Sequence, residues 1–374
     1  MTVLAILFWV SVALLVYTHV GYPLLLAALA RARGRRSFEW PEGQPLPAVS
    51  VIVAAYAEES VIADRVANLR ALNYPELEIV VACDGSPDRT AERALEAGAD
   101  LVLELPRGGK VRAQDAAVER AEGAIVAFSD ANARWAPDAL SELVAPFADP
   151  HVGYVCGEVR LTGEDDTNQE GLYWRYELRI RDWESRLRSV TGGNGAIYAT
   201  RREAYQVVDP IMGHDLSFPF KIVKHGWLAL FNPRAISSEK MVPTIEGEFA
   251  RKRRMMAHTW PIVVRGGMLS PRGYDPLYAL MIFSHRILRY LSPFLHVVAL
   301  GTSIALISQS LVYVAAVAVQ AALLVAAAAA RAAPMRPLLV ARYYVLTTAS
   351  LAAGLWDWLR HGTSAGWEPA AGTR

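Results

Sequence analysis

Charged residues are missing from two long parts of the chain. Residues 1–30 and 291–330 contain no Asp, Glu, Lys or Arg, although these four types make up 20% of the 374 residues. A helix needs about 20 mainly apolar residues to cross a bilayer. The first part therefore predicts one membrane-spanning helix, and the second predicts two, with their turn at Ser308, Gln309 and Ser310.

Cysteine is also scarce, and neither sign of charge dominates. The two cysteines, Cys83 and Cys156, lie in apolar runs, which predicts buried thiols in a reducing compartment rather than a disulfide. Their positions give no zinc-ligand spacing. The net charge is +1, so the composition does not signal the basic surface of a nucleic-acid-binding protein, and we expect no nucleic-acid partner.

A fourth apolar segment, residues 338–359, contains Arg342 and Asp357 near its ends. Such side chains can reach the membrane surface, which predicts a further span; the alternative is a helix lying on the bilayer. Four of residues 31–36 are arginines, so the positive-inside rule places the following chain in the cytoplasm. The first apolar run is long and has no basic residue before it, which favours an uncleaved anchor over a signal peptide.

Between these segments, apolar runs alternate with helical patterns. Strands are predicted at residues 49–55, 77–83 and 124–129, and helices at 58–72, 89–97 and 110–121. Further strands are predicted at 153–159 and 196–200, with a charged helix at 169–189. Strand–helix alternation of this kind predicts a doubly wound, parallel sheet.

Acidic residues end two of the predicted strands. Asp84 ends the second, and Asp130 ends the third, with Asn132 two residues later. Because parallel strands bring their carboxyl ends to one rim, these side chains can converge on a ligand. The oxygens of Asp130 and Asn132 suit a divalent cation held against a diphosphate. The alternative is that each aspartate only bonds the backbone of its own turn.

Two loops are candidates for backbone contacts with a ligand. Tyr56 and Glu58 lie at the start of a predicted helix, whose first backbone amides favour a phosphate. The alternative is that Glu58 only stabilises this helix end through the helix dipole. Gly193, Asn194 and Gly195 form a glycine-rich turn, which permits either close approach to a ligand or only a tight turn.

Basic residues flank the later apolar segments. Residues 251–254 are basic and an apolar stretch follows, which predicts a helix in the headgroup plane that binds anionic lipid. Arg254 is alternatively a diphosphate contact. His285, Arg286 and Arg289 precede the second span and are predicted to form an interfacial collar.

With the Gly109 and Lys110 loop and Asp215, these motifs resemble a family 2 glycosyltransferase of the inverting, nucleotide-sugar-using kind. The similarity is to membrane-bound members akin to cellulose and hyaluronan synthases. It implies a Rossmann-like GT-A domain with a mixed, mainly parallel sheet, plus transmembrane helices at both ends. The expected divisions are an anchor (1–30), a basic, proline-rich linker (31–48), a cytoplasmic glycosyltransferase domain (49–245), an amphipathic interfacial region (246–290), about three transmembrane helices (291–359) and a tail (360–374).

The resemblance also implies roles for individual residues. Donor-binding residues are Tyr56, Glu58, Asp84, Lys110, Asp130 and Arg254. Asp130 and Asn132 correspond to the Asp-X-Asp pair, which binds Mg²⁺ or Mn²⁺ on the sugar diphosphate. Asp215 corresponds to the general base, and Gly193, Asn194 and Gly195 are expected on the acceptor side.

The sequence departs from the family pattern at four places, one of which is Gln114 and Asp115 after the Lys110 loop. Asn132 replaces the second acid of the metal pair, and His214 stands where a second acid usually precedes the base. Arg251 and Met255 replace the glutamine and tryptophan of the Gln-x-x-Arg-Trp box of processive enzymes.

The expected function is transfer of a sugar, with inversion, from a nucleotide-diphosphate-sugar to a lipid-linked or glycan acceptor at the inner membrane. Membrane lipids are expected partners. The alternatives are a processive polysaccharide synthase and a non-catalytic, nucleotide-sugar-binding membrane component.

Overall fold

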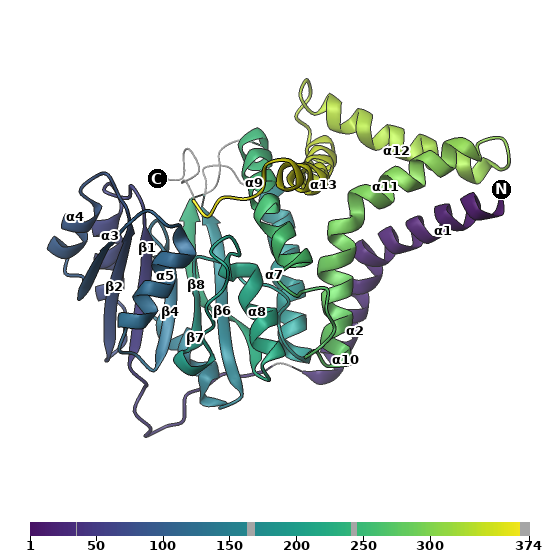
Figure 1. Ribbon diagram of the computed structural model, residues 1–374. Coiled ribbons are helices and arrows are strands. Elements are labelled where there is room, and N and C mark those ends of the chain that lie inside the picture. The colour runs from purple at the N-terminus through teal and green to yellow at the C-terminus, as the bar shows by residue number, and fades with distance from the viewer. Residues whose placement is uncertain (35, 163–168, 241–244, 367–374) are drawn as a thin grey trace.

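The domain between the apolar segments is built around a single sheet (Figure 1). The computed structural model describes residues 1–34, 36–162, 169–240 and 245–366, and in these the sheet has eight strands. They are β1 (Val49–Ala55), β2 (Leu77–Asp84), β3 (Leu101–Leu105), β4 (Ile125–Asp130), β5 (Arg134–Trp135), β6 (Val152–Thr162), β7 (Tyr198–Arg201) and β8 (Leu228–Lys240).

The strand order is β3-β2-β1-β4-β7-β6-β8-β5. β3, β2, β1 and β4 run parallel, β7 is antiparallel to both of its neighbours, and β8 is parallel to β6. The predicted mixed, mainly parallel sheet is therefore confirmed.

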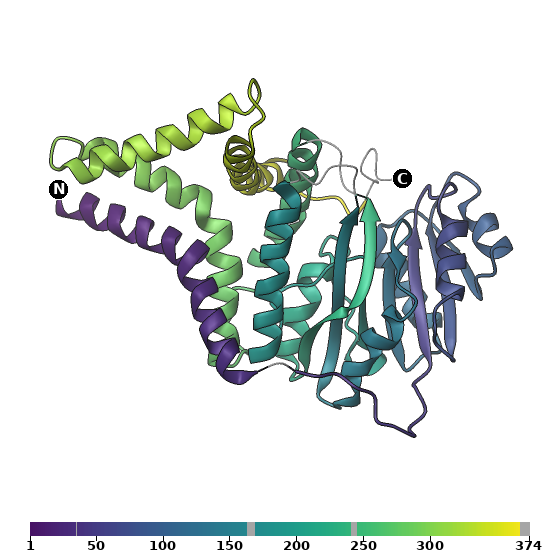
Figure 2. The same cartoon turned by 180° about the vertical axis from the view of Figure 1, so that it is seen from behind.

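Helices cover both faces of the sheet and form a group beside it (Figures 1 and 2). Those of the sheet domain are α3 (Ile62–Arg70), α4 (Thr90–Glu96), α5 (Lys110–Arg120), α6 (Ala139–Val144), α7 (Gln169–Leu187) and α8 (His214–Lys224). Those beside it are α1 (Thr2–Val16), α2 (Tyr22–Arg33), α9 (Ile245–Val264), α10 (Pro276–Met281), α11 (Leu288–Ala305), α12 (Leu311–Ala329) and α13 (Arg336–His361). Short 3-10 turns form at Ala145–Ala148 and Arg202–Ala204.

β1 is buried along its whole length, and its successive side chains enter two different cores. Ile52 and Ala54 pack on the side of α5 and α8, whereas Val51 and Val53 pack on the side of α3 and α6. This division follows from the alternation of side chains along a strand. Because both faces are covered, the run is apolar throughout.

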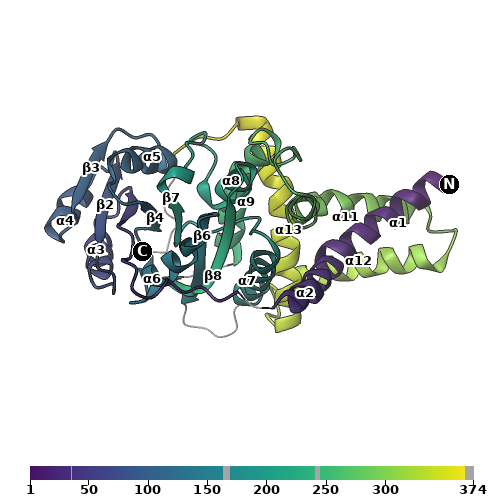
Figure 3. The ribbon, with the colours of Figure 1, turned by 90° about the horizontal axis from the view of Figure 1, so that it is seen from below.

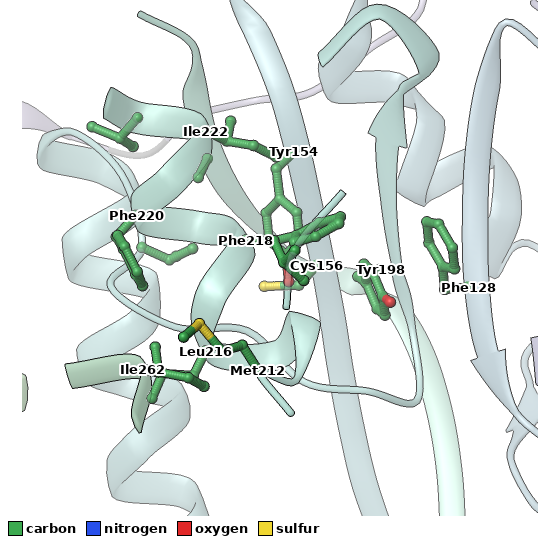
Figure 4. Packing of buried hydrophobic residues seen from close by; sticks show 14 of the residues in the cluster. Phe128, Tyr154, Cys156, Tyr198, Met212, Leu216, Phe218, Phe220, Ile222 and Ile262 are labelled. Atoms are coloured by element: carbon green, nitrogen blue, oxygen red, sulfur yellow. The ribbon is translucent and has the colours of Figure 1, made fainter. Parts of the chain in front are cut away.

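The first of these cores reaches from the sheet to α8 and α9 (Figure 4). The rings of Phe128 and Tyr198 stack with their centroids 4.7 Å apart, and Phe218 meets Tyr198 edge to face. Ile262 of α9 belongs to the same core, so the helices beside the domain pack directly on it.

The predicted strands at 49–55, 77–83 and 124–129 are confirmed to within one residue at each end. β8 was not predicted, although it is 13 residues long. Asn232, Pro233 and Arg234 interrupt its apolar pattern where its register against β6 shifts between Gly157 and Glu158. Because of this irregularity, the segment lacks the regular alternation of apolar residues from which a strand is predicted.

Four helices in the described part of the chain are long and apolar enough to cross a membrane. They are Thr2–Arg33, Pro276–Ala305, Leu311–Ala329 and Arg336–His361. The predicted turn at Ser308 lies between the second and third of these helices. The first two contain π-helical turns, Tyr17–Gly21 and Ile282–Ile287. A hydrogen bond of 2.9 Å between Tyr17 Oη and Ser284 Oγ joins these two turns.

α13 lies across α11 and α12 rather than alongside them (Figures 1 and 3). It packs on α9 and α12 and also contacts α11. In this arrangement a bilayer crossed by α1, α11 and α12 would have α13 along its surface, which is the alternative left open for residues 338–359.

Candidate active site

The carboxyl ends of β1, β2 and β4 share one rim, as the parallel order requires. Ala54 of β1 is in register with Asp130 of β4, and Ala55 is in register with Cys83, which precedes Asp84. Asp84 and Asp130 therefore share one rim, as predicted, but they are not on neighbouring strands, because β1 lies between β2 and β4.

A cavity of about 880 Å³ opens beside this rim. Its lining includes the following predicted site residues: Lys110, Asp130, Gly193, Asn194, Gly195, Asp215 and Arg254. Tyr56, Glu58, Asp84 and Asn132 do not line it. Ala365 and Gly366 close part of the cavity, and Thr363 before them donates a 2.7 Å hydrogen bond to the Ala257 carbonyl of α9.

One charge contact in the cavity joins Lys110 and Asp130. Lys110 begins α5, and its ammonium donates a hydrogen bond to Asp130 Oδ1. Burial alone would lower the pKa of Lys110, but the Asp130 carboxylate raises it above its ordinary value. The pair is therefore ionic.

Asp84 is buried and holds the loop before α5 in place. Its carboxylate accepts hydrogen bonds from the backbone amides of Gly108 (2.6 Å) and Gly109 (3.0 Å). Arg107 Nη1 donates to Asp84 Oδ2 at 2.9 Å, and its guanidinium carbon lies 3.2 Å from the centroid of the Tyr56 ring. The sequence reasoning missed Arg107, although its position just before the Gly108–Gly109–Lys110 loop was a usable signal.

Glu58 lies in the interior behind this loop. Its side chain is buried, and its backbone amide donates to Thr90 Oγ1 at 2.9 Å. Glu58 thus ties the end of β1 to the start of α4, while the Tyr56 ring is covered by Arg107.

Asp215 lies in the first turn of α8 and faces the cavity. Its backbone carbonyl accepts a 2.6 Å hydrogen bond from the Gly193 amide, which fixes α8 against the glycine-rich turn. The neighbouring His214 is buried, and its Nδ1 lies 2.9 Å from Tyr198 Oη. Burial and the charge of Lys110 hold the pKa of His214 well below its ordinary value, so its imidazole is neutral.

The glycine-rich turn is held by one of its own side chains and lies beside the Lys110–Asp130 pair. Asn194 Nδ2 donates to the Gly157 carbonyl at 2.8 Å, and its Oδ1 accepts from the amides of Ala196 and Ile197, so this side chain builds the turn. A Cβ at Gly195 would lie 3.3 Å from Lys110 Nζ. The backbone of Gly195 therefore approaches the charged pair closely, as a ligand-facing turn would.

A buried polar cluster lies behind the turn. Glu184 accepts hydrogen bonds from Tyr22 Oη (2.7 Å) and the Thr191 amide (3.1 Å) and lies 2.7 Å from His285 Nδ1. Arg289 pairs with Glu177, which also lies 3.3 Å from His285 Nε2.

This cluster corrects one prediction. His285, Arg286 and Arg289 do not form an interfacial collar: they face buried carboxylates of α7 and the Thr191 hydroxyl, to which Arg286 Nε donates at 3.0 Å. Burial raises the pKa of Glu177, but Arg289 and His285 bring it well below the ordinary value, so the cluster is charged.

Asp130 is the candidate ligand for a divalent cation. Among the described residues, no group of three His, Cys, Asp or Glu side chains is arranged to hold a metal ion. One carboxylate still fits a cation that is completed by water and by the phosphates of a substrate, as is common for Mg²⁺. The residues therefore fit a metal that arrives with its diphosphate rather than one held by the protein alone.

Comparison with known proteins finds similarity to one family over the sheet domain. Residues 50–208 match glycosyl transferase family 2. An N-acetylglucosaminyltransferase of Rhizobium meliloti (strain 1021) is 28% identical over 287 residues, which cover 70% of this chain and 63% of that protein. A beta-monoglucosyldiacylglycerol synthase of Trichormus variabilis (strain ATCC 29413 / PCC 7937) is 28% identical over 299 residues, 72% of this chain and 62% of that protein. The chain thus spans less than two thirds of the length of these curated relatives.

A solved structure resembles nearly the whole chain. It is the mannosyltransferase PcManGT from Pyrobaculum calidifontis in complex with GDP-Man and Mn²⁺, with a TM-score of 0.73 and 25% identity. The match covers 95% of this chain and 99% of that one. Residues 50–208 are thus similar to glycosyl transferase family 2, and the sheet domain has the GT-A fold that the resemblance implied.

Proposed function

We propose that this chain is a membrane-bound glycosyltransferase. It transfers a sugar, with inversion, from a nucleotide-diphosphate-sugar to a lipid-linked or polysaccharide acceptor in cell-envelope or exopolysaccharide synthesis. The observation that carries the proposal is one cavity lined by the Lys110–Asp130 pair, Arg254 and the Asp215 carboxylate. The ligands in the PcManGT complex, GDP-Man and Mn²⁺, support a nucleotide sugar and a divalent cation.

The donor occupies the β-strand rim. Lys110 and Arg254 stabilise the negative charge that develops on the leaving diphosphate. Tyr56, Glu58 and Asp84 lie toward the nucleoside, with Arg107 between Tyr56 and Asp84. A bound Mg²⁺ or Mn²⁺, held by Asp130 with Asn132 two residues on, supplies further charge neutralisation there.

Asp215 acts as the general base. It removes the proton from the acceptor hydroxyl as the hydroxyl oxygen attacks the anomeric carbon and the bond to the diphosphate breaks. One displacement inverts the configuration at that carbon. His214 is neutral and engaged with Tyr198, so the carboxylate beside it is the group suited to receive the proton. Gly193, Asn194 and Gly195 border the acceptor next to this base.

The proposed location is the inner membrane. Residues 49–245 form the catalytic domain on the cytoplasmic side, and the supporting feature is the arginine-rich segment directly after the first apolar helix. Residues 1–30 serve as the anchor, and residues 291–359 hold the later membrane segments.

A donor screen tests the proposal. The purified full chain is incubated with a panel of nucleotide sugars, beginning with GDP-mannose, and with Mn²⁺, Mg²⁺ or EDTA. We expect cation-dependent release of nucleoside diphosphate from one donor and an inverted linkage in the product. Release from none of them, with donor binding retained, would establish the non-catalytic alternative. A ladder of long products would establish a processive synthase.

A further inference from the structure

The cavity does not end at the catalytic carboxylates. Its lining continues onto three of the four candidate membrane-spanning helices, through His19 of the first, Tyr290 and Ser292 of the second, and Tyr343, Tyr344, Thr347 and Thr348 of the fourth. The same cavity therefore begins at Asp130 and Asp215 and ends between apolar helices. We call this inner end, lined by His19, Tyr176, Tyr344 and Thr347, the inter-helix chamber.

The inter-helix chamber lies where two helices leave regular α geometry. His19 is part of the π-helical turn Tyr17–Gly21, and its backbone carbonyl accepts a hydrogen bond of 3.4 Å from Tyr176 Oη of α7. Such turns often occur at functional sites, because they release backbone and side-chain groups from the regular helix pattern. The first helix therefore carries a polar side chain to the cavity from within an apolar segment.

Neutral hydrogen-bonding groups line the inter-helix chamber. The Tyr344 hydroxyl lies 2.8 Å from His296 Nε2 and 3.4 Å from His19 Nε2, and Thr347 adds a hydroxyl one turn further along α13. Polar groups within membrane segments face cavities or one another, because lipid cannot satisfy their hydrogen bonds. These groups suit the hydroxyls of a ligand head group.

The cations near the inter-helix chamber already have partners in the protein. Arg289 pairs with Glu177, and Lys252 Nζ lies 5.4 Å from the centroid of the Tyr343 ring. An anionic head group would have to compete with the Glu177 carboxylate for Arg289. A neutral head group faces no such competition.

We propose that the inter-helix chamber binds the acceptor, and that the acceptor is a membrane lipid with a neutral, hydroxyl-bearing head group. This inference rests on the proposed function and narrows its acceptor. The lipid enters between the apolar helices, its head group bonds with Tyr344 and Thr347, and one hydroxyl reaches Asp215. That oxygen bonds to the anomeric carbon, its proton passes to Asp215, and the nucleoside diphosphate leaves.

The test uses the full chain in phosphatidylcholine vesicles with a labelled donor. Separate arms contain diacylglycerol, a monoglycosyl diacylglycerol, a polyprenyl phosphate, or a soluble oligosaccharide outside the vesicles. We expect label in one of the two neutral lipids, and the arm that is labelled identifies the head group. Preferred labelling of the polyprenyl phosphate or the oligosaccharide would overturn the inference, and so would nucleoside diphosphate release with none of the four labelled.

Two variants locate the site. Tyr344→Phe and Thr347→Val should each raise the KM for the lipid by about five- to tenfold, because each removes one hydrogen bond, and should change the KM for the donor less. Tyr313→Phe on α12, whose side chain does not line the cavity, should leave both values unchanged. An unchanged lipid KM in both chamber variants would refute the site.

Direct binding separates this inference from the proposed function. Native mass spectrometry of the full chain with the same four acceptors reports binding without any transfer. Neutral-lipid adducts that Tyr344→Phe weakens and Tyr313→Phe does not would support the inter-helix chamber even if every donor failed. Adducts that all variants retain equally would reject it even if transfer occurred.

Discussion

The ammonium of Lys110 donates a hydrogen bond to the Asp130 carboxylate, and Gly195 lies close enough to both that a side chain there would meet them. The carboxylate assigned to the metal is therefore neutralised by the protein's own cation. A divalent ion and a diphosphate entering together would each take one partner of this pair: the ion takes Asp130, and the phosphate takes Lys110.

Lys110→Met should change the affinity for Mn²⁺ and the affinity for the nucleotide sugar in opposite directions. Without the ammonium, Asp130 is an uncompensated carboxylate, so Mn²⁺ alone should bind more tightly. The nucleotide sugar should bind about tenfold to a hundredfold more weakly, because a charge-assisted hydrogen bond to the diphosphate is lost. Calorimetry with Mn²⁺ and with the donor measures both. The control is Lys221→Met on α8, outside the cavity lining, which should alter neither affinity. Weaker Mn²⁺ binding in Lys110→Met would contradict the exchange of partners between Lys110, Asp130, the ion and the diphosphate.

Asn132→Asp should restore the missing acid of the metal pair. A second carboxylate two residues after Asp130 adds one negative charge beside the cation, so the Mn²⁺ concentration for half-maximal transfer should fall about three- to tenfold. Asn73→Asp, an exposed change of the same type, is the control and should have no effect. An unchanged requirement for Mn²⁺ would show that position 132 does not contact the metal.

Asp215→Asn should abolish transfer and leave donor binding near normal. The amide cannot accept the acceptor's proton, and loss of a general base typically lowers the rate about 100- to 10,000-fold. Single-turnover transfer and equilibrium binding of the nucleotide sugar are measured in parallel. Asp209→Asn changes an exposed acid close by that does not line the cavity, and it should keep full activity. If Asp215→Asn retained full transfer, Asp215 would not be the general base.

Asp115 should make stability depend on pH without any role in catalysis. Burial raises its pKa from 3.8 to about 6, partly offset by the hydrogen bond of 2.6 Å from Tyr205 Oη. The folded chain therefore holds this proton more tightly than the unfolded chain, so its contribution to stability is complete below pH 3.8 and is lost as the pH rises through 6.

Asp115→Asn should remove this pH dependence. The amide stays neutral, so the variant should have a higher Tm than the parent protein at pH 8 and a similar one at pH 4. Thermal unfolding in detergent at the two pH values measures the difference. Asp64→Asn, at an exposed position of α3, is the matched control. An equal Tm difference at both pH values would show that the Asp115 pKa is not raised.

Local sequence patterns predicted the strand ends that form the rim of the sheet, but not the loop that packs against that rim. The strand ends that carry Asp84 and Asp130 follow from continuous apolar runs, because a strand covered on both faces reads clearly in one dimension. Asp84 accepts hydrogen bonds from Gly108 and Gly109, which lie 24 and 25 residues later in the chain. No local pattern around Asp84 could therefore indicate that its carboxylate holds this loop.

The wrong prediction for His285, Arg286 and Arg289 has the same cause. Basic residues beside an apolar segment match the pattern of a membrane collar. Their partners, Glu177 and Glu184, lie on a helix about a hundred residues earlier, and only the folded chain brings the two together. A charged helix such as α7 was predicted, but its buried face could not be inferred from its composition.

Glu184→Gln should destabilise the fold through this cluster. The change keeps the shape of the side chain but removes the charge that faces His285 and the oxygen contacts with Tyr22 and Thr191. A buried donor left without its acceptor costs about 1 to 3 kcal/mol, so unfolding in detergent should occur at a clearly lower denaturant concentration. Glu92→Gln, whose partner Arg89 is exposed, should leave the denaturant midpoint nearly unchanged. Equal effects of the two changes would mean that the cluster does not hold the N-terminal helix and the glycine-rich turn together.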